Sequence, residues 1–250
     1  MPMRDALGNR MKNYELTSKT ILMSRTPVAI RVDGKAFHTF TKHLNKPFDS
    51  IFMDTMIQTM EAMCADIQNC IFGYVQSDEI TFILKDYEQL NTSAWFDNEV
   101  QKLCSISASM ATYYFNKFFN KNAMPYINAH PNNEYTSALI HCLDAPAMFD
   151  ARAFNVPREE VINLIYWRQL DAVRNSIQAC GQANFSHNKL INKSCAEIKE
   201  MLAEIGKPWE AIPIYKQRGT CCLRENKQWI TDYSMPMFVK EGREYLEAFI

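Results

Sequence analysis

Hydrophobic and polar side chains alternate over residues 27–33, PVAIRVD, where Val28, Ile30 and Val32 share one face. Alternation with a period of two is typical of a half-buried β-strand. The pattern therefore predicts a strand that ends in an aspartate, Asp33.

A helix and two more strands are predicted next along the chain. From Ser50 to about Asn69, methionine, isoleucine and cysteine residues recur at helical spacing, which indicates an amphipathic helix. Residues 71–84 return to aromatic and β-branched composition but are interrupted by Gln76-Ser77-Asp78-Glu79. This composition suits two short strands joined by a tight turn.

The pattern over residues 94–156 predicts one more helix and more strands. Residues 94–120 predict a long helix whose small residues would let it lie close to a sheet, and residues 120–135, rich in Pro and Asn, predict a loop. The segments ALIHC, residues 138–142, and FDARAFNV, residues 149–156, are strand-like. An order β-α-β-β-α-β is that of the split βαβ, ferredoxin-like plan.

After Pro157 the periodicity becomes helical, which divides the chain in two. Ser194 and Glu197 form a capping-box pattern that predicts the start of a second helix in this part. We therefore predict an α+β domain over residues 1–156 and a helical appendage over residues 157–250. In its first helix the expected apolar stripe is Ile162, Tyr166, Leu170, Val173 and Ile177, and the expected polar face is Arg168, Asp171, Asn175 and Gln178.

Composition supports a globular protein and leaves its partners open. With 250 residues and 47% apolar side chains the chain can bury a core, and with 27 basic and 28 acidic residues any nucleic acid must be held by a local patch. The eight cysteines show no CxxC spacing, so we expect reduced thiols. No apolar run approaches the roughly 20 residues of a membrane span, so we expect a cytoplasmic protein without a membrane segment.

The candidate chemistry rests on two aspartates. In a split βαβ sheet the strand ending at Asp33 lies beside the hairpin that turns at Asp78, so both carboxylates can emerge at one edge. Mg²⁺ is held by one or two carboxylates together with waters and substrate phosphates. Two such ions, about 3.5 to 4 Å apart, would stabilise the attacking and leaving oxygens of a phosphoryl displacement.

The residues after Asp33 suggest a nucleotide site. Gly34 lets the backbone approach a ligand, and the amide groups of the following Lys35-Ala36-Phe37-His38 could cradle a triphosphate. Lys46 offers a cation for phosphate, and Asp49 could accept from the N1 and N2 donors of guanine. Each feature has a plainer interpretation, because Asp-Gly is a common hairpin signal and isolated basic residues are usually surface residues.

The ordered set of motifs resembles one family. RVDGKAFHTF, KPFD, YVQSDEITF, FDARAF, WRQLDAVRNS and RGT, in this order, are similar to motifs of the tRNA-histidine guanylyltransferase superfamily, whose enzymes extend RNA in the 3′ to 5′ direction. The resemblance covers about residues 4 to 222. It implies a polymerase-like palm of the split βαβ type followed by helices, with two Mg²⁺ ions as cofactors and ATP and GTP as substrates.

The resemblance also implies roles for individual residues. Asp33, Asp78 and the Gly34 carbonyl would be the metal ligands, and Glu79 would support catalysis. The nucleotide-binding positions would be Gly34, Lys35, Ala36, Phe37, His38, Lys46, Asp49 and Ser77.

One departure bears on the substrate. Enzymes that add guanosine to histidine tRNA carry His-Ile-Asn-Asn where this chain has Val173-Arg174-Asn175-Ser176. The chain is instead similar to the bacterial and phage-type proteins, which resemble enzymes that repair truncated tRNA 5′ ends against the opposite strand as template. Family members commonly assemble as tetramers, so a homotetramer is expected. The expected tRNA contacts are Arg168, Arg174, Asn175, Lys189, Lys216 and Arg218.

Three other functions stay open. Guanylyl addition specific to histidine tRNA uses the same chemistry. A nucleotide cyclase could use the same two aspartates on a nucleotide's own 3′-hydroxyl. A non-catalytic RNA-binding module would need aromatic side chains on an open sheet face.

Overall fold

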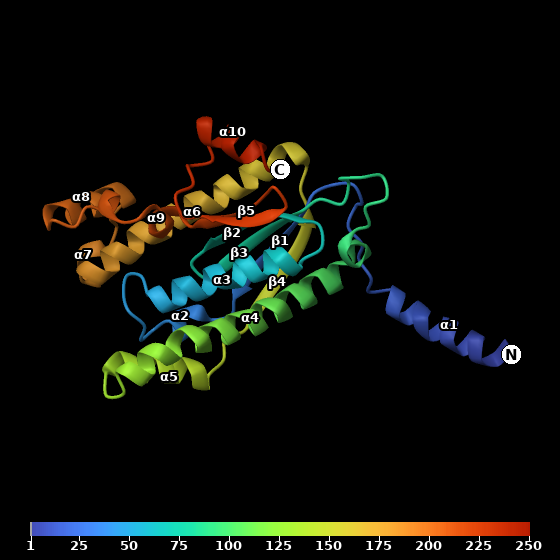
Figure 1. The fold of residues 1–250 in the computed structure, drawn as a ribbon, viewed down its shortest axis with the longest axis horizontal. Helices are drawn as coiled ribbons and strands as arrows, with labels where there is room; N and C mark the ends of the chain where they lie inside the picture. Colours follow the sequence, from blue (N-terminus) through green and yellow to red (C-terminus); the bar gives the residue numbers. More distant parts are fainter. Residues whose placement is uncertain (1) are drawn as a thin grey trace.

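The computed structural model describes residues 2–250 and shows an antiparallel sheet of six strands with helices on both faces (Figure 1). In the sheet the strand order is β4-β1-β3-β2-β5-β6. The strands are β1 (Val28–Gly34), β2 (Cys70–Gln76), β3 (Glu79–Leu84), β4 (Phe149–Asn155), β5 (Thr220–Glu225) and β6 (Gln228–Asp232).

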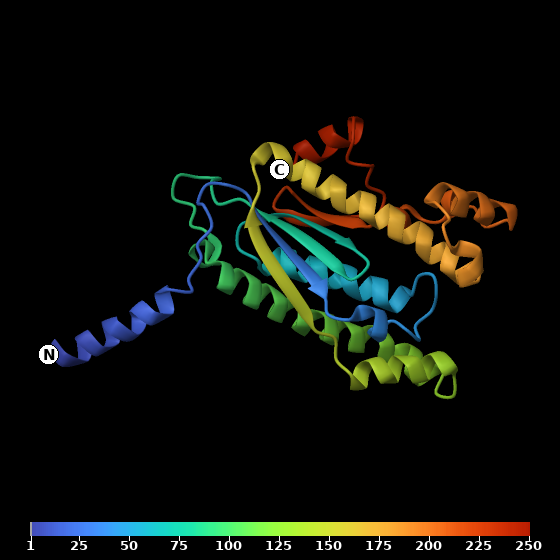
Figure 2. The same cartoon turned by 180° about the vertical axis from the view of Figure 1, so that it is seen from behind.

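The helices differ greatly in length and in their relation to the sheet. The helix α1 (Pro2–Leu16) projects away from the rest of the molecule (Figure 2). The others are α2 (Phe37–Phe40), α3 (Ser50–Asp66), α4 (Val100–Ala129), α5 (Glu134–Asp144), α6 (Val161–Asn184), α7 (His187–Leu190), α8 (Cys195–Glu204), α9 (Ile214–Arg218) and α10 (Glu241–Glu247), with short 3-10 helices at Trp95–Asn98, Arg158–Glu160 and Trp209–Ala211.

The predicted strands before residue 85 are confirmed. β1 follows the alternating segment, and β2 and β3 form a hairpin whose turn is Ser77-Asp78. β1 lies between β3 and β4, with Asp33 opposite Glu79 on one side and Asp150 on the other. The sheet therefore brings the end of β1 and the start of β3 together.

Among the described residues two of the three hydrophobic cores lie on the sheet, one on each face, and a smaller one surrounds Ile177 between α6 and α8. On one face, α3 and α4 pack against side chains such as Ile30 and Phe82. On the other face, Tyr74 and Ile83 are fully buried beneath α6 and the C-terminal segment that includes α10. Both faces are thus covered, so neither offers the open aromatic platform that an RNA-binding module would need.

Two element predictions before residue 156 are wrong. The ALIHC segment lies in α5, where Asn133 caps the helix through a 2.8 Å bond from the Tyr135 amide, and Leu139 and Cys142 are buried at helical spacing. The expected loop at residues 120–135 is helical as far as Ala129, because buried Phe119 and Ala123 continue the inner face of α4.

The segment after residue 156 is not only helical. β5 and β6 extend the sheet, since β5 pairs with β2 through Thr220 to Leu223. Cys221, Cys222 and Leu223 are buried on both sides of the sheet, so the strand lacks the alternation that marks a half-buried strand.

The inner face of α6 also differs from the expected stripe. Ile162 and Ile177 are buried as predicted, but Leu170 is 45% exposed while Arg168 and Gln169 are buried. Partners for these polar groups explain the difference. Gln169 donates to the Pro236 carbonyl and accepts from the Phe238 amide, and Arg168 pairs with a carboxylate of the sheet.

Over the described part of the chain, none of the helices has the length and apolarity needed to span a bilayer.

Candidate nucleotide-binding site

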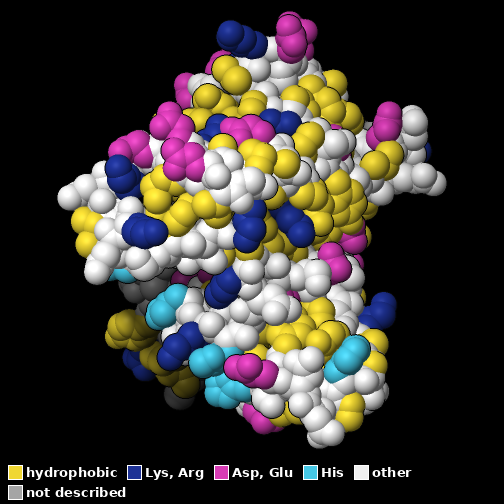
Figure 3. Space-filling model, turned by 90° about the vertical axis from the view of Figure 1, so that its left-hand side faces the viewer, with side chains coloured by type: hydrophobic (Ala, Val, Ile, Leu, Met, Phe, Trp, Pro, Cys, Tyr) yellow, Lys and Arg dark blue, Asp and Glu magenta, His cyan; other side chains and the backbone are white. Residues whose placement is uncertain are grey.

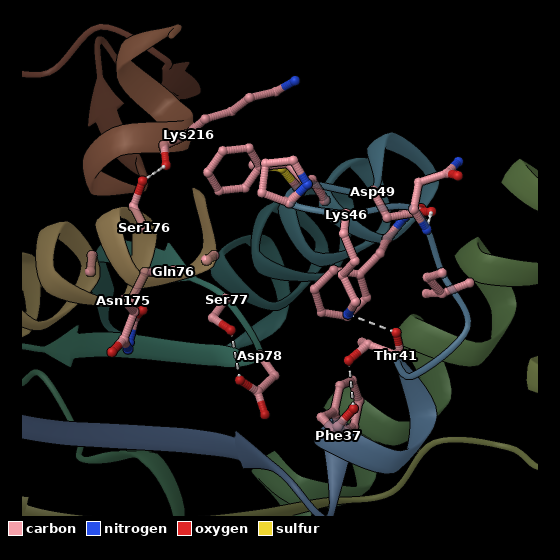
Figure 4. Close-up of a pocket in the computed structure, with 18 of the residues that line it drawn as sticks. Phe37, Thr41, Lys46, Asp49, Gln76, Ser77, Asp78, Asn175, Ser176 and Lys216 are labelled. Carbon is pink, nitrogen blue, oxygen red and sulfur yellow. Dashed lines mark hydrogen bonds between the residues drawn. The ribbon is translucent and has the colours of Figure 1, made fainter. Parts of the chain in front are cut away.

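A pocket of about 700 Å³ lies between the segment that follows β1 and the wall formed by α6 and α9 (Figure 4). Its volume is within the range of small-ligand sites, about 300 to 1,000 Å³. The predicted residues that line it are Gly34, Ala36, Phe37, His38, Lys46, Asp49, Ser77, Asp78, Asn175 and Lys216.

Basic side chains occur on the end of the molecule at which α5, α7 and α8 lie. Figure 3 shows several lysine and arginine side chains near the middle of this face, with histidines mainly below them and acidic side chains also present. Within the pocket lining, Lys46 and Lys216 lie on opposite walls, one before α3 and one on α9 (Figure 4). Anionic ligands would therefore meet positive charge from both sides.

The two aspartates meet at the edge of the sheet. The Gly34 amide donates to the Asp78 carbonyl over 3.1 Å, which places Asp33 next to the β2–β3 turn. Burial raises the pKa of the Asp33 carboxyl, and the nearby Asp78 and Asp150 carboxylates raise it further. Burial also raises the pKa of Asp78, although its Oδ1 accepts a 2.9 Å bond from the Ser77 hydroxyl. Among the described residues neither carboxylate forms an ion pair within 4 Å, although the more distant Arg152 and Arg31 lower the pKa of Asp33 and His38 lowers that of Asp78.

This donor set fits Mg²⁺. The groups available are hard oxygens: the Asp33 and Asp78 carboxylates and nearby backbone carbonyls. Burial disfavours the charged form of both carboxylates, and the Asp78 carboxylate further disfavours the charge on Asp33. Within residues 2–250, no three or more His, Cys, Asp or Glu side chains group so as to form a metal cage of their own. A site with two carboxylates that is completed by waters and substrate phosphates is the usual arrangement for Mg²⁺.

The segment Gly34 to His38 is held rigidly by its aromatic residue. Phe37 is 3% exposed and packs against Phe40, Phe115 and Phe149 at centroid distances of 5.0 to 5.4 Å. A Cβ atom on Gly34 would lie only 2.3 Å from the Phe37 ring, so this position requires glycine. The ring of Phe37 thus belongs to the core, so a nucleotide contact of this residue would use its backbone amide, as the sequence predicts for this segment.

The amide groups of this segment divide into two sets. Those of Gly34 and Lys35 donate to the carbonyls of Asp78 and Met148. The amides of Ala36, Phe37 and His38, at the start of α2, take part in none of the hydrogen bonds within the described part of the chain. Only these three can turn to a phosphate. The Lys35 side chain lines a separate pocket of about 240 Å³.

Asp49 has a structural role that the sequence does not reveal. It caps α3, where its oxygens accept from the Phe52 amide at 2.9 Å, the Asn45 amide at 3.0 Å and the Tyr135 hydroxyl at 2.6 Å. Because the side chain is 5% exposed and already accepts three hydrogen bonds, the geometry does not favour its expected role as the acceptor for guanine. Nearby Lys46 donates to the Thr41 carbonyl at 2.8 Å.

The predicted tRNA-binding residues lie in different places. Arg168 is buried against Glu79, so the expectation of an exposed Arg168 is wrong. Arg174 is exposed and pairs with Asp171, and Lys189 is exposed on α7. Asn175 and Lys216 line the nucleotide pocket, whereas Arg218 is partly buried and lies outside its lining.

The wall on α6 and α9 was missed by reasoning from sequence. It includes Ala172, Ala179 and the buried Ser176, whose hydroxyl donates to the Lys216 carbonyl at 2.8 Å and accepts from the Trp209 indole at 3.0 Å. Alanine and a helical serine carry no chemical signal of a binding site. Their periodicity on α6 could have marked a small-residue face, although nothing in it specifies a nucleotide.

Solved structures that are similar to this chain contain bound nucleotides. The chain is similar to a bacterial tRNA(His) guanylyltransferase (Thg1)-like protein in complex with ATP, with 35% identity, a TM-score of 0.85, and coverage of 98% of this chain and 99% of that one. It is also similar to such a protein in complex with GTP, with 34% identity and a TM-score of 0.78, over 98% of each chain.

Comparison of sequences also finds relatives of this chain, among them a protein named as a tRNA(His) guanylyltransferase. An uncharacterised protein of Acanthamoeba polyphaga mimivirus is 26% identical over 88% of this chain and 78% of its own length. A probable tRNA(His) guanylyltransferase of Dictyostelium discoideum is 29% identical over 67% of this chain, which spans 58% of that protein.

The mixed helical and antiparallel fold, with its nucleotide-binding relatives, defines the chain as a nucleotidyltransferase. The family model described as tRNAHis guanylyltransferase matches residues 8–157, more than half of the sequence. The chain belongs to the tRNAHis guanylyltransferase family.

Proposed function

We propose that this chain is a template-dependent 3′-5′ nucleotidyltransferase that rebuilds incomplete 5′ ends of tRNA. The observation that carries the proposal is the position of Asp78, which lines the 700 Å³ pocket and lies beside Asp33 at the edge of the sheet. A triphosphate lying along the free amides of Ala36 to His38 would present its α-phosphate to this acidic edge.

The strand order supports a palm-like catalytic unit. β4, β1, β3 and β2 are neighbours in that order and come from the element order β-α-β-β-α-β once α2 is counted with α3 and α4 with α5. This is the arrangement of the split βαβ plan. In it the palm covers residues 1–156, and the remainder packs α6 against the sheet and closes the pocket.

The reaction has two transfers. First, an oxygen of the tRNA 5′-monophosphate attacks the α-phosphate of a nucleoside triphosphate, which displaces pyrophosphate and forms a nucleotidyl-capped end. The 3′-hydroxyl of an incoming nucleoside triphosphate then attacks the 5′-phosphate of the capped end and displaces the capping nucleoside monophosphate. Hydrolysis of the new 5′-triphosphate releases pyrophosphate and restores a monophosphate end. Two Mg²⁺ ions held by Asp33, Asp78 and the Gly34 carbonyl would neutralise the charge that develops on the phosphate oxygens.

Residues of the chain would position the reactants. Lys46 and Lys216 offer positive charge on either side of the pocket, and Ser77 holds the Asp78 carboxylate. Arg174 and Lys189 are exposed and could contact tRNA phosphates, while Watson–Crick pairing with the opposite strand would select the nucleotide. We also propose a homotetramer, which light scattering would test.

A second candidate is guanylyl addition specific to histidine tRNA, which the names of several relatives favour. In this chain the run Val173-Arg174-Asn175-Ser176 takes the place of His-Ile-Asn-Asn. Its Ser176 is buried and hydrogen-bonded to Trp209 and Lys216, and its Val173 packs against the small core around Ile177. Only Arg174 and Asn175 of the run are exposed. Recognition of one anticodon by this run is therefore not favoured.

The test is an extension assay with purified protein, ATP, GTP and Mg²⁺. We expect the protein to extend a 5′-truncated, 5′-monophosphorylated tRNA of any identity up to the last base that has a partner on the opposite strand. A histidine tRNA lacking only its extra 5′ guanosine serves as the competing substrate. Extension of the histidine tRNA alone would favour the second candidate, and extension of neither would refute both.

A further inference from the structure

An arginine of α6 is buried against the catalytic end of the sheet. Arg168 is 7% exposed, and its Nε donates to Oε1 of Glu79, also 7% exposed, over 2.7 Å. A second nitrogen of the same guanidinium donates to Asp171 Oδ2 at 2.8 Å. The charged group of Arg168 is therefore committed to two carboxylates, one on β3 and one on its own helix.

The other oxygen of Glu79 also has a partner. Arg31 on β1 places its Nε 3.8 Å from Glu79 Oε2. The ring of Trp167 lies against both guanidinium groups, with the Cζ atom of Arg168 4.4 Å and that of Arg31 5.7 Å from its centroid. Glu79 thus joins β1, β3 and α6 through one carboxylate.

Glu79 occupies a particular position relative to the acidic edge. It follows Asp78 in the chain and lies directly opposite Asp33 in the β1–β3 pairing. Burying a charged pair is costly unless geometry and hydrogen bonding are good, and breaking it leaves an uncompensated charge. Movement of Glu79 would therefore be transmitted to the backbone of both aspartates.

Building on the proposed function, we propose that Arg168 is a positioning residue for nucleotidyl transfer and not a tRNA contact. By holding Glu79 it fixes Asp78 against Asp33, and it fixes α6 across the same edge. A misplacement of about 1 Å at reacting groups can cost on the order of 10²-fold in rate. The far wall of the pocket is held separately, by Ser176 with Lys216 and Trp209, so nucleotide affinity depends little on Arg168.

The test measures transfer rate and binding in the same set of variants. The variants are Arg168→Gln, Arg168→Lys, Glu79→Gln and the double variant Glu79→Gln/Arg168→Gln. For each, we measure the single-turnover rate of nucleotide addition to a 5′-truncated tRNA, the Kd for ATP, and the Kd for tRNA at two salt concentrations. Urea unfolding identifies conditions in which every variant is folded.

We expect a loss of rate with little change in affinity. Arg168→Gln should slow addition by roughly 10²-fold, Arg168→Lys should recover part of that loss, and both Kd values should stay within about threefold of wild type. The double variant should be no slower than the slower single variant, because both changes disrupt one interaction.

Other outcomes would overturn the inference. A double variant slowed by the product of the two single effects would show that Arg168 acts independently of Glu79. Weaker tRNA binding with a smaller salt dependence would show that Arg168 contacts phosphate. Inactive wild-type protein would instead count against the proposed function. If Arg168→Gln fails to fold, Asp171→Asn, which weakens the second partner of Arg168 and also the pair with Arg174, must give a smaller loss of rate with the Kd for ATP unchanged.

The matched control is Arg243→Gln. Arg243 also donates to α6, through a 3.0 Å bond from its Nη1 to Asn163, but it lies on α10 away from the pocket. Its removal should leave the rate and both Kd values unchanged. A loss equal to that of Arg168→Gln would mean that any loosening of α6 slows transfer, which contradicts a specific role for the pair with Glu79.

Discussion

Asp33 lies directly opposite Glu79 in the antiparallel pairing of β1 with β3, so their side chains share one face of the sheet. Burial raises the pKa of both carboxyl groups, but their surroundings differ. Glu79 has Arg168 and Arg31 as partners, whereas the charges nearest Asp33 include the like-charged Asp78. The free acidic site is therefore Asp33 with Asp78, and Glu79 supports it.

Replacing Asp33 by asparagine should abolish transfer while stabilising the fold at neutral pH. The pKa of Asp33 is raised in the folded state, so folding favours the protonated form, and this group costs stability once the pH rises above its unfolded pKa. Removing the charge removes that cost. We expect a higher melting temperature for Asp33→Asn at pH 7, and a loss of rate of at least about 10²-fold, measured by single-turnover extension.

The same variant tests the proposed metal site. A ligand that binds only the folded state stabilises it by RT ln(1 + [L]/Kd), about 1.4 kcal/mol at ten times Kd. Mg²⁺ should therefore raise the melting temperature of the wild type, and EDTA should reverse the effect. If Asp33→Asn and Asp78→Asn respond to Mg²⁺ as the wild type does, the ion binds elsewhere.

Gly34→Ala should destabilise the protein and weaken nucleotide binding. The added Cβ would meet the Phe37 ring at 2.3 Å, and that ring is packed among other aromatic residues and cannot move freely. Forcing an extra carbon into a packed core typically costs about 1 to 3 kcal/mol. Urea unfolding measures the loss of stability, and equilibrium binding measures the Kd for ATP.

Gly8→Ala is the matched control for this prediction. A Cβ at Gly8, on α1, meets nothing within 4 Å. Alanine is favoured over glycine in a helix by about 1 kcal/mol, so stability should not fall and ATP should bind as before. Equal effects of the two substitutions would contradict the packing argument at Gly34.

Filling the pocket from α6 should block nucleotides without unfolding the protein. Ala179 lines the pocket on the wall opposite the Gly34 to His38 segment. A tryptophan there would occupy space that the ligand needs, so the Kd for ATP and for GTP should each rise by more than about tenfold, or 1.4 kcal/mol. Ala203→Trp, at an exposed position of α8, should leave both unchanged. Normal binding by Ala179→Trp would place the nucleotide in another site.

A short sequence pattern could predict those elements that are more buried on one face than on the other. β1 alternates because one of its faces packs against α3 and α4 more fully than the other packs against α6, and α3 shows a helical stripe because one side faces solvent. β5 is buried on both faces and shows no alternation. ALIHC is too short an apolar run to distinguish helix from strand, and the deciding signal was the cap at Asn133.

The candidate site was predictable where chemistry needs particular residue types. Asp33, Gly34 and Asp78 meet as expected, because carboxylates and a glycine carry a signal in the sequence. The burial of Arg168 could not be predicted, since its partner Glu79 is 89 residues away. Nor could the role of Ala172 or Ala179, because a small side chain leaves room for a ligand without any chemical signature.

Asp49→Asn should weaken the binding of ATP and GTP equally. The Asp49 carboxylate accepts from the Asn45 and Phe52 amides and from the Tyr135 hydroxyl, so it holds together the start of α3, the preceding loop and α5. An asparagine can keep the bond from the Phe52 amide that caps α3, but it loses the second acceptor oxygen, which receives the Asn45 amide and the Tyr135 hydroxyl. Losing a hydrogen bond of this kind should cost about 1 kcal/mol of stability. Lys46 and Phe48, on the same loop, would shift with it, so the binding of both nucleotides would weaken alike.

A carboxylate that paired with guanine would instead give a selective loss of GTP binding, because adenine lacks the N1 and N2 donors. Tyr135→Phe removes one bond to Asp49 without touching the pocket lining, and it should reproduce the unselective effect at smaller size. Equilibrium binding of ATP and GTP to the three proteins distinguishes the two roles.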